Sequence, residues 1–118
     1  MFELQDNVVC YGQMNNPLVI LKQMDVFVLA SRYEGKPVSV VEALALQKPC
    51  IVTEYASARE QIEDGINGLV VKNSSEGIYE GLKKYIESEC MRKLLKEGAK
   101  NIKYNENTDE IEKLYRLI

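Results

Sequence analysis

The sequence predicts an α/β fold in which a parallel sheet of about four strands is flanked by helices. Short apolar runs that suit strands alternate along the chain with segments whose apolar residues recur at helical spacing. The run from Asp25 to Ala30 is apolar on both faces, as is typical of a strand inside a parallel sheet. Because parallel strands are joined by crossover connections, the alternation indicates right-handed strand–helix–strand units.

Four segments are predicted to be the strands, because each is a short apolar run bounded by turn residues. The first ends at Gly12, and the turns Asp64-Gly65 and Asn67-Gly68 precede the last. The four segments are Val8–Tyr11, Asp25–Ala30, Pro49–Thr53 and Leu69–Val71.

Helix starts are predicted from capping residues. Asn16 before Pro17 is typical of an N-cap followed by the first helical position. The segment Ser57–Glu60 has the spacing of a capping box, and Ser74 or Ser75 caps a later helix. The expected helices cover about 17–24, 38–45, 57–62, 75–86, 91–104 and 108–117.

Composition and charge exclude several classes of function. The 118 residues are 46% apolar and 28% charged, as in an ordinary globular domain. A net charge of −3 is too small and too evenly spread to favour nucleic acid or an anionic membrane as a partner. No apolar run reaches the ~20 residues that span a bilayer, and the first residues lack the pattern of a signal peptide.

The cysteines and the missing histidine narrow the chemistry further. Cys10, Cys50 and Cys90 are isolated and odd in number, which favours free, mostly buried thiols in a cytoplasmic protein. The chain contains no histidine, so it cannot supply an imidazole base or a histidine metal ligand. It also lacks an Asp-x-Asp pair, so we expect neither a metal nor a cofactor.

Two glutamates, Glu34 and Glu42, bracket the segment that carries most information about function. Glu34 follows a strand-like run, and Glu42 lies in a helix-like run that starts after the turn Gly35–Pro37. The free N–H groups and the dipole at a helix start favour an anion. Two carboxylates beside such a site suit a phosphate that carries hydroxyl-rich groups, which indicates a nucleotide sugar.

Five blocks along the chain share their order and content with one enzyme family. The blocks are Asp25–Ser31, Glu34-Gly35, Glu42–Ala45, Lys48–Thr53 and Asn67–Val70. They resemble the family-4 retaining glycosyltransferases of GT-B fold, and the glutamate pair matches that family's E-x7-E motif. The resemblance implies that residues 1–118 are part of the C-terminal, donor-binding domain, whose Rossmann-like second half they resemble.

The resemblance also implies roles for individual residues. Glu42 would bind the ribose hydroxyls, and Glu34 would contact the donor sugar, which makes Glu34 the candidate catalytic residue. Backbone amides at the start of the following helix would hold the diphosphate, and the residues after the first strand would lie near the base. The implied donor-binding residues are Gly12, Gln13, Met14, Glu34, Gly35, Lys36, Val38, Ser39, Val40 and Glu42.

The chain departs from the family in two respects. Many members have Gly-Phe-Gly after the first glutamate, whereas this chain has Gly35-Lys36-Pro37, and proline has no N–H to donate to the donor. The family's C-terminal domain has two earlier strands with basic residues between them, and its acceptor domain carries a histidine. None of these has a counterpart in this sequence. The family's strand order would place the two missing strands between Val8–Tyr11 and Asp25–Ala30, so Val8–Tyr11 would close against Asp25–Ala30, pair with a second copy, or fray.

The sequence therefore predicts the donor-binding piece of a metal-independent, retaining glycosyltransferase that is inactive alone. Such an enzyme moves a hexose or related sugar to a glycan or lipid-linked acceptor. The expected partners are a nucleotide sugar, the missing N-terminal half and, through an exposed edge strand, a second copy, with membrane contact only in the full-length enzyme. Two alternatives stay open: a non-catalytic binding or assembly module, and a sugar-nucleotide epimerase or phosphorylase of the same fold.

Overall fold

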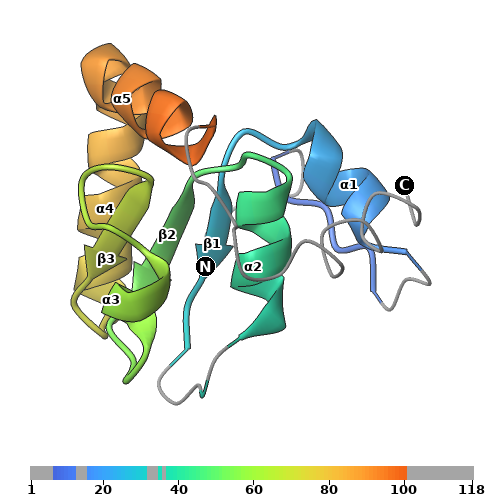
Figure 1. The fold of residues 1–118 in the computed structure, drawn as a ribbon, viewed down its shortest axis with the longest axis horizontal. Coiled ribbons are helices and arrows are strands. Elements are labelled where there is room, and N and C mark those ends of the chain that lie inside the picture. Colours follow the sequence, from blue (N-terminus) through green and yellow to red (C-terminus); the bar gives the residue numbers. More distant parts are fainter. Residues whose placement is uncertain (1–6, 13–15, 32–34, 36, 101–118) are drawn as a thin grey trace.

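The computed structural model of the chain describes residues 7–12, 16–31, 35 and 37–100. Within these residues, three parallel strands form one sheet in the order β1-β2-β3 (Figure 1). The strands are β1 (Phe27–Leu29), β2 (Cys50–Thr53) and β3 (Gly68–Val71). The parallel α/β architecture is confirmed, and three of the four predicted strands are present.

The central strand β2 anchors the sheet. All four of its residues are buried, and Ile51 is aligned with Val28 on one side and with Leu69 on the other. A strand that is covered on both faces and paired on both edges exposes no backbone polar group to an apolar surrounding. The apolar run that predicted this strand therefore matches its place in the fold.

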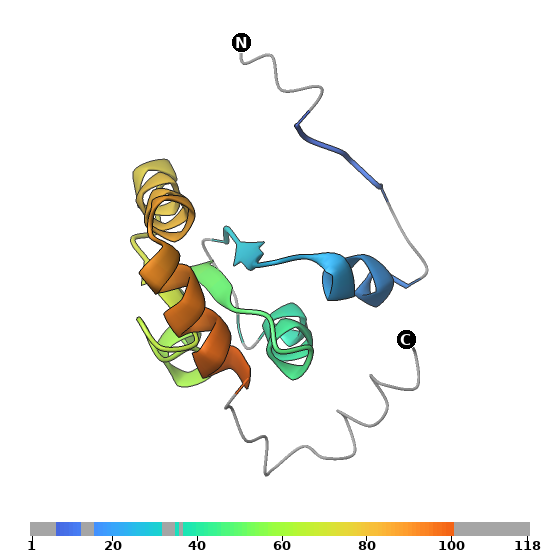
Figure 2. The same cartoon turned by 90° about the horizontal axis from the view of Figure 1, so that it is seen from above.

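The predicted strand Val8–Tyr11 is wrong. These residues belong to none of the strands in the described part of the chain, and they are exposed, with 68% of Val9 accessible. In Figure 2 they lie apart from the sheet. A strand needs a partner for its backbone hydrogen bonds, and in the described residues Val8–Tyr11 do not pair with β1, the edge strand of the sheet. Of the three outcomes considered, closure against β1 is absent from the described residues, and pairing with a second copy stays a prediction.

Three helices cover one face of the sheet: α1 (Leu18–Gln23), α2 (Val38–Ala45) and α3 (Ala58–Gln61). Alternate residues of β2 point to this face, because side chains alternate along a strand. The core between them is formed by Val40, Ala43, Leu44, Cys50, Val52, Tyr55, Ala58, Ile62 and Val70.

The other face is covered by α4 (Ser75–Glu87) and α5 (Glu89–Lys100) (Figure 2). Ile51 and Leu69 from the strands pack there with Tyr85 and Leu95 from the helices. No helix among the described residues is both long and apolar enough to cross a bilayer. The helix predicted over 108–117 and the end of the one predicted over 91–104 lie outside the described residues.

The capping predictions had mixed outcomes. The Asn16 side chain accepts the N–H of Leu18 at 3.3 Å, but Pro17 is the N-cap of α1, so the helix begins one residue later than predicted. The Ser74 side chain accepts the N–H of Gly77 at 3.0 Å and caps α4. The capping box at Ser57 is wrong, because its hydroxyl makes no cap bond to α3 and instead donates to the carbonyl of Gly35.

The cysteines are free thiols, and the expectation that most are buried is wrong. Cys50 lies in the core, whereas Cys10 and Cys90 are exposed. Burial raises the pKa of the Cys50 thiol to about 12, because the low-dielectric interior disfavours a thiolate. Cys50 is therefore a neutral core residue and not a nucleophile.

Candidate functional site

The candidate site lies at the carboxyl ends of β1 and β2. The chain leaves β1 toward α2 and leaves β2 toward α3, so both connections lie at the same edge of the sheet (Figure 1). Ligands of open parallel sheets bind at this edge. Four predicted site residues, Gln13, Met14, Glu34 and Lys36, lie outside the described residues.

Helix α2 begins without a side-chain cap. Pro37 occupies the N-cap position in an extended conformation, with φ −64° and ψ 128°. Proline has no side-chain oxygen to accept the first helical N–H groups, and the first turn of α2 contains no acidic residue. The N–H groups of Val38, Ser39 and Val40 thus begin the helix at the positive end of its dipole, which is the arrangement that binds anions.

Glu42 lies one turn after this helix start and lines a cavity of about 330 Å³ between α1 and α2. Ser39 lines the same cavity, so the structure brings two predicted site residues together. Apart from these two, the lining residues are Tyr11, Pro17, Leu18, Ile20, Leu21, Met24 and Phe27. An apolar wall with few polar groups is typical of a small-molecule site.

Tyr11, the last residue of the predicted first strand, lies in this region, and Gly12 follows it in the chain. Gly12 is exposed and has φ +68°, a left-handed conformation that favours glycine. Tyr11 lines the cavity that contains Glu42, although the sequence interpretation treated it as a buried strand residue. Its position beside Gly12, a predicted site residue, was the signal that could have identified it.

The loop after β1 is fixed at its start by Thr53, the last residue of β2. The N–H of Ser31 donates to the Thr53 hydroxyl oxygen at 3.0 Å, and the same hydroxyl donates to the Ser31 carbonyl. Asn73 also donates to this carbonyl, at 3.2 Å. Because Thr53 is only 1% exposed, water competes poorly for these bonds. The sequence interpretation gave no role in the site to Thr53 or Asn73.

A second set of contacts fixes the end of the same loop, where α2 begins. The Ser57 hydroxyl donates to the Gly35 carbonyl. The Gln61 side-chain amide donates to the Pro37 carbonyl at 3.2 Å, and the Tyr55 hydroxyl donates to the Gln61 side-chain oxygen at 2.8 Å. The segment that follows β2 therefore holds the residues that precede α2. The sequence signal for a role of this segment was its place directly after β2, the strand that pairs with β1.

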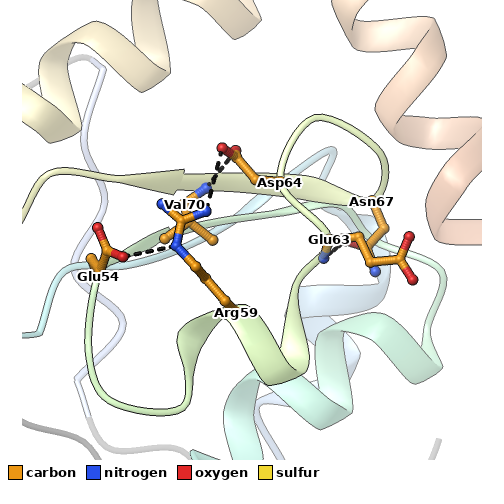
Figure 3. A network of polar contacts seen from close by, with 6 residues as sticks. All are labelled: Glu54, Arg59, Glu63, Asp64, Asn67 and Val70. Atoms are coloured by element: carbon orange, nitrogen blue, oxygen red, sulfur yellow. Dashed lines mark hydrogen bonds and ion pairs between the residues drawn. The ribbon is translucent and has the colours of Figure 1, made fainter.

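Arg59, on α3, is held by carboxylates (Figure 3). Its Nε lies 2.8 Å from Glu54 Oε1, and its Nη1 lies 3.9 Å from Asp64 Oδ2. The hydrogen bond and charge of Arg59 lower the pKa of the Glu54 carboxyl. The other oxygen of Asp64 accepts the N–H of Val70 at 3.0 Å. Arg59 therefore links α3 to the residue that follows β2 and to the turn that precedes β3.

The described residues contain no group of three or more His, Cys, Asp or Glu side chains arranged to hold a metal ion. This finding does not extend to the rest of the chain. The expectation that neither a metal nor a cofactor takes part stays a prediction.

Residues 2–102 match the family model described as "Glycosyl transferases group 1". The chain therefore belongs to the group 1 glycosyltransferases, and the resemblance noted in its sequence is confirmed.

Individual relatives are glycosyltransferases by name. The chain is 36% identical over 105 residues, 86% of its length, to an uncharacterized glycosyltransferase of Methanocaldococcus jannaschii. It is 33% identical over 99 residues, 82% of its length, to the N-acetylgalactosamine-N,N'-diacetylbacillosaminyl-diphospho-undecaprenol 4-alpha-N-acetylgalactosaminyltransferase of Campylobacter jejuni. It is 29% identical over 106 residues, 89% of its length, to the capsular polysaccharide biosynthesis glycosyltransferase CapM of Staphylococcus aureus. The matched regions are 26%, 27% and 28% of these relatives, so the chain spans about a quarter of their length.

The contacts of Thr53 predict a specific loss of stability. Thr53→Val keeps the shape of the side chain but removes the hydroxyl that pairs with both backbone groups of Ser31. We expect the free energy of unfolding to fall by about 2 kcal/mol in urea denaturation, because buried polar groups lose their partner. Thr53→Ser keeps the hydroxyl and is the control, with a loss of about 1 kcal/mol for the methyl group. Equal stability of the two variants would contradict the role given to the hydroxyl.

Proposed function

We propose that this chain is the donor-binding part of a retaining, metal-independent glycosyltransferase and that it binds a nucleotide-diphosphate sugar. The observation that carries the proposal is the uncapped start of α2, one turn before Glu42 and beside an apolar cavity. An anion site, a carboxylate and an apolar wall match the diphosphate, the ribose and the base of one ligand. Membership of the group 1 glycosyltransferases supports the same ligand class.

In this proposal the backbone holds the diphosphate. The N–H groups of Val38, Ser39 and Val40 donate to phosphate oxygens at the positive end of the α2 dipole. Hydrogen bonds to charged oxygens are about twice as strong as neutral ones. As the donor bond breaks, negative charge grows on the leaving diphosphate, and donors already aimed at it stabilise the transition state.

The roles of the other donor-binding residues are those implied by the E-x7-E motif. Glu42 accepts hydrogen bonds from the ribose hydroxyls, and the base lies against the apolar wall near Tyr11 and Gly12. Glu34 contacts the donor sugar at the reacting centre. Gly35 and Lys36 belong to the turn between the two glutamates, and Gln13 and Met14 lie near the base. Glu34, Lys36, Gln13 and Met14 are assigned from the motif alone.

The rest of the enzyme is the partner that this proposal requires. The chain spans about a quarter of its relatives, and β1 is the edge strand nearest the cavity, with one side unpaired among the described residues. We place the preceding part of the enzyme against this edge. The alternative is a second copy of this chain, which would form a homodimer through the same edge. The acceptor in this proposal is a glycan or a lipid-linked sugar, and the name of the Campylobacter relative contains a sugar linked to diphospho-undecaprenol.

The names of the relatives favour a transferase over an epimerase or a phosphorylase. The non-catalytic module remains the second candidate, because the edge of β1 and the apolar cavity offer a surface for a partner chain. Size-exclusion chromatography with the preceding part of the enzyme tests that binding.

The proposal predicts that the purified chain transfers no sugar. It lacks histidine and, by the proposal, the acceptor half of the enzyme. The assay measures nucleoside diphosphate released from UDP-, GDP- and ADP-sugars with a lipid-linked acceptor, with and without the preceding part of the enzyme. Turnover by the chain alone would contradict the proposal.

The role of Glu42 is tested by titrating the chain with UDP-, GDP- and ADP-sugars. We expect Glu42→Ala to weaken binding of the preferred donor by about 10- to 100-fold, the equivalent of one hydrogen bond to a carboxylate. Glu87→Ala removes the same charge from an exposed position at the end of α4 and serves as the matched control. Unchanged affinity in Glu42→Ala would show that the assignment is wrong.

A further inference from the structure

We propose that Gln61, oriented by Tyr55, is a positioning residue that aims the first N–H of α2 at the diphosphate of the donor. The inference rests on the proposed function and adds to it a residue that lies outside the E-x7-E motif. The contact on which it depends joins α3 to the start of α2, across 24 positions of the sequence.

The orientation of the Gln61 amide is fixed by its two contacts. Tyr55 is 5% exposed and belongs to the core beneath α3. Its hydroxyl donates to Gln61 Oε1 at 2.8 Å, so Gln61 Nε2 is the atom that faces Pro37. That nitrogen donates to the Pro37 carbonyl at 3.2 Å. A rigid aromatic side chain thus orients the amide that holds the start of α2.

The hydrogen bond from Gln61 to the Pro37 carbonyl also sets the direction of the Val38 N–H, because the peptide group is planar. The carbonyl of Pro37 and the N–H of Val38 belong to the same peptide plane, and in a trans peptide they point in opposite directions. When Gln61 holds the carbonyl toward α3, the N–H of Val38 is aimed away from α3. Rotation of this plane would instead turn a partly negative oxygen toward the bound phosphate, which would repel it.

The need for an external contact follows from Pro37 itself. An N-cap serine, threonine, asparagine or aspartate anchors the first turn with its own side chain, and proline cannot. Such a residue would also occupy an N–H that the ligand requires. Ser57 acts in the same manner on the Gly35 carbonyl. The α3 segment therefore fixes the carbonyls that precede α2 and leaves the helical N–H groups for the donor.

The inference is tested with two variants and a matched control. Gln61→Met keeps the length of the side chain and removes the donor, and Tyr55→Phe removes the hydroxyl that orients it. Tyr85→Phe is the control, because Tyr85 is also buried and its hydroxyl donates to the Asp25 carbonyl, on the opposite face of the sheet. Calorimetry compares the affinities for UDP, GDP and ADP with those for uridine, guanosine and adenosine.

For the preferred nucleotide, we expect Gln61→Met to weaken diphosphate binding by about five- to tenfold, the equivalent of one hydrogen bond. Tyr55→Phe should have a smaller effect in the same direction, and Tyr85→Phe none. Affinity for the nucleoside should stay unchanged in all three, because the nucleoside has no phosphate. An equal loss for nucleoside and diphosphate would indicate a merely structural role and overturn the inference.

A measurement without ligand separates this inference from the proposed function. The ¹⁵N–¹H signal of Val38 should move in Gln61→Met and stay in place in Tyr85→Phe. An unmoved signal overturns the positioning role of Gln61. If the unchanged chain binds none of the three nucleotides, the proposed function fails and the phosphate part of the inference fails with it. The Val38 signal then decides separately whether Gln61 orients the peptide.

Discussion

The paired hydrogen bonds between Thr53 and Ser31 are the constraint on which the candidate site depends. β1 ends at Leu29, whereas β2 continues to Thr53, so the side chain of Thr53 supplies the bonds that a longer β1 would make. One buried hydroxyl accepts from the Ser31 N–H and donates to its carbonyl. This contact fixes where the chain leaves β1, and α3 then fixes where it enters α2. The two segments together determine the position of the helix start.

These constraints account for an unusual combination at the site. The start of α2 is left without a side-chain cap at a cost of about 1 kcal/mol, yet hydrogen bonds from Ser57 and Gln61 hold the residues that precede it. A helix start that has no side-chain cap but is held in place keeps its N–H groups free and oriented, which favours the binding of an anion. Arg59 is paired with Glu54 and Asp64, and the proposed recognition of the donor therefore gives it no role.

Features that depend on local sequence patterns could be predicted from the sequence. β2 and α2 follow from apolar runs and spacing, and Ser39 and Glu42, which line one cavity, follow from the motif. Val8–Tyr11 was mispredicted because an apolar run shows that a segment can be buried but not that a neighbouring strand exists. Ser57 fitted a capping box, but its acceptor is a carbonyl 22 positions earlier. Contacts across 22 to 24 positions, including those of Thr53 and Gln61, leave no local pattern.

The central claim is that the start of α2 binds the diphosphate of a nucleotide sugar. The most direct test is an NMR titration of the ¹⁵N-labelled chain with UDP, GDP and ADP, with the backbone signals assigned. The account predicts that at least one nucleotide shifts the amide signals of Val38, Ser39 and Val40 most strongly, while those of α4 and α5 stay in place. Shifts confined to α4 and α5, or none with any of the three nucleotides, would contradict it.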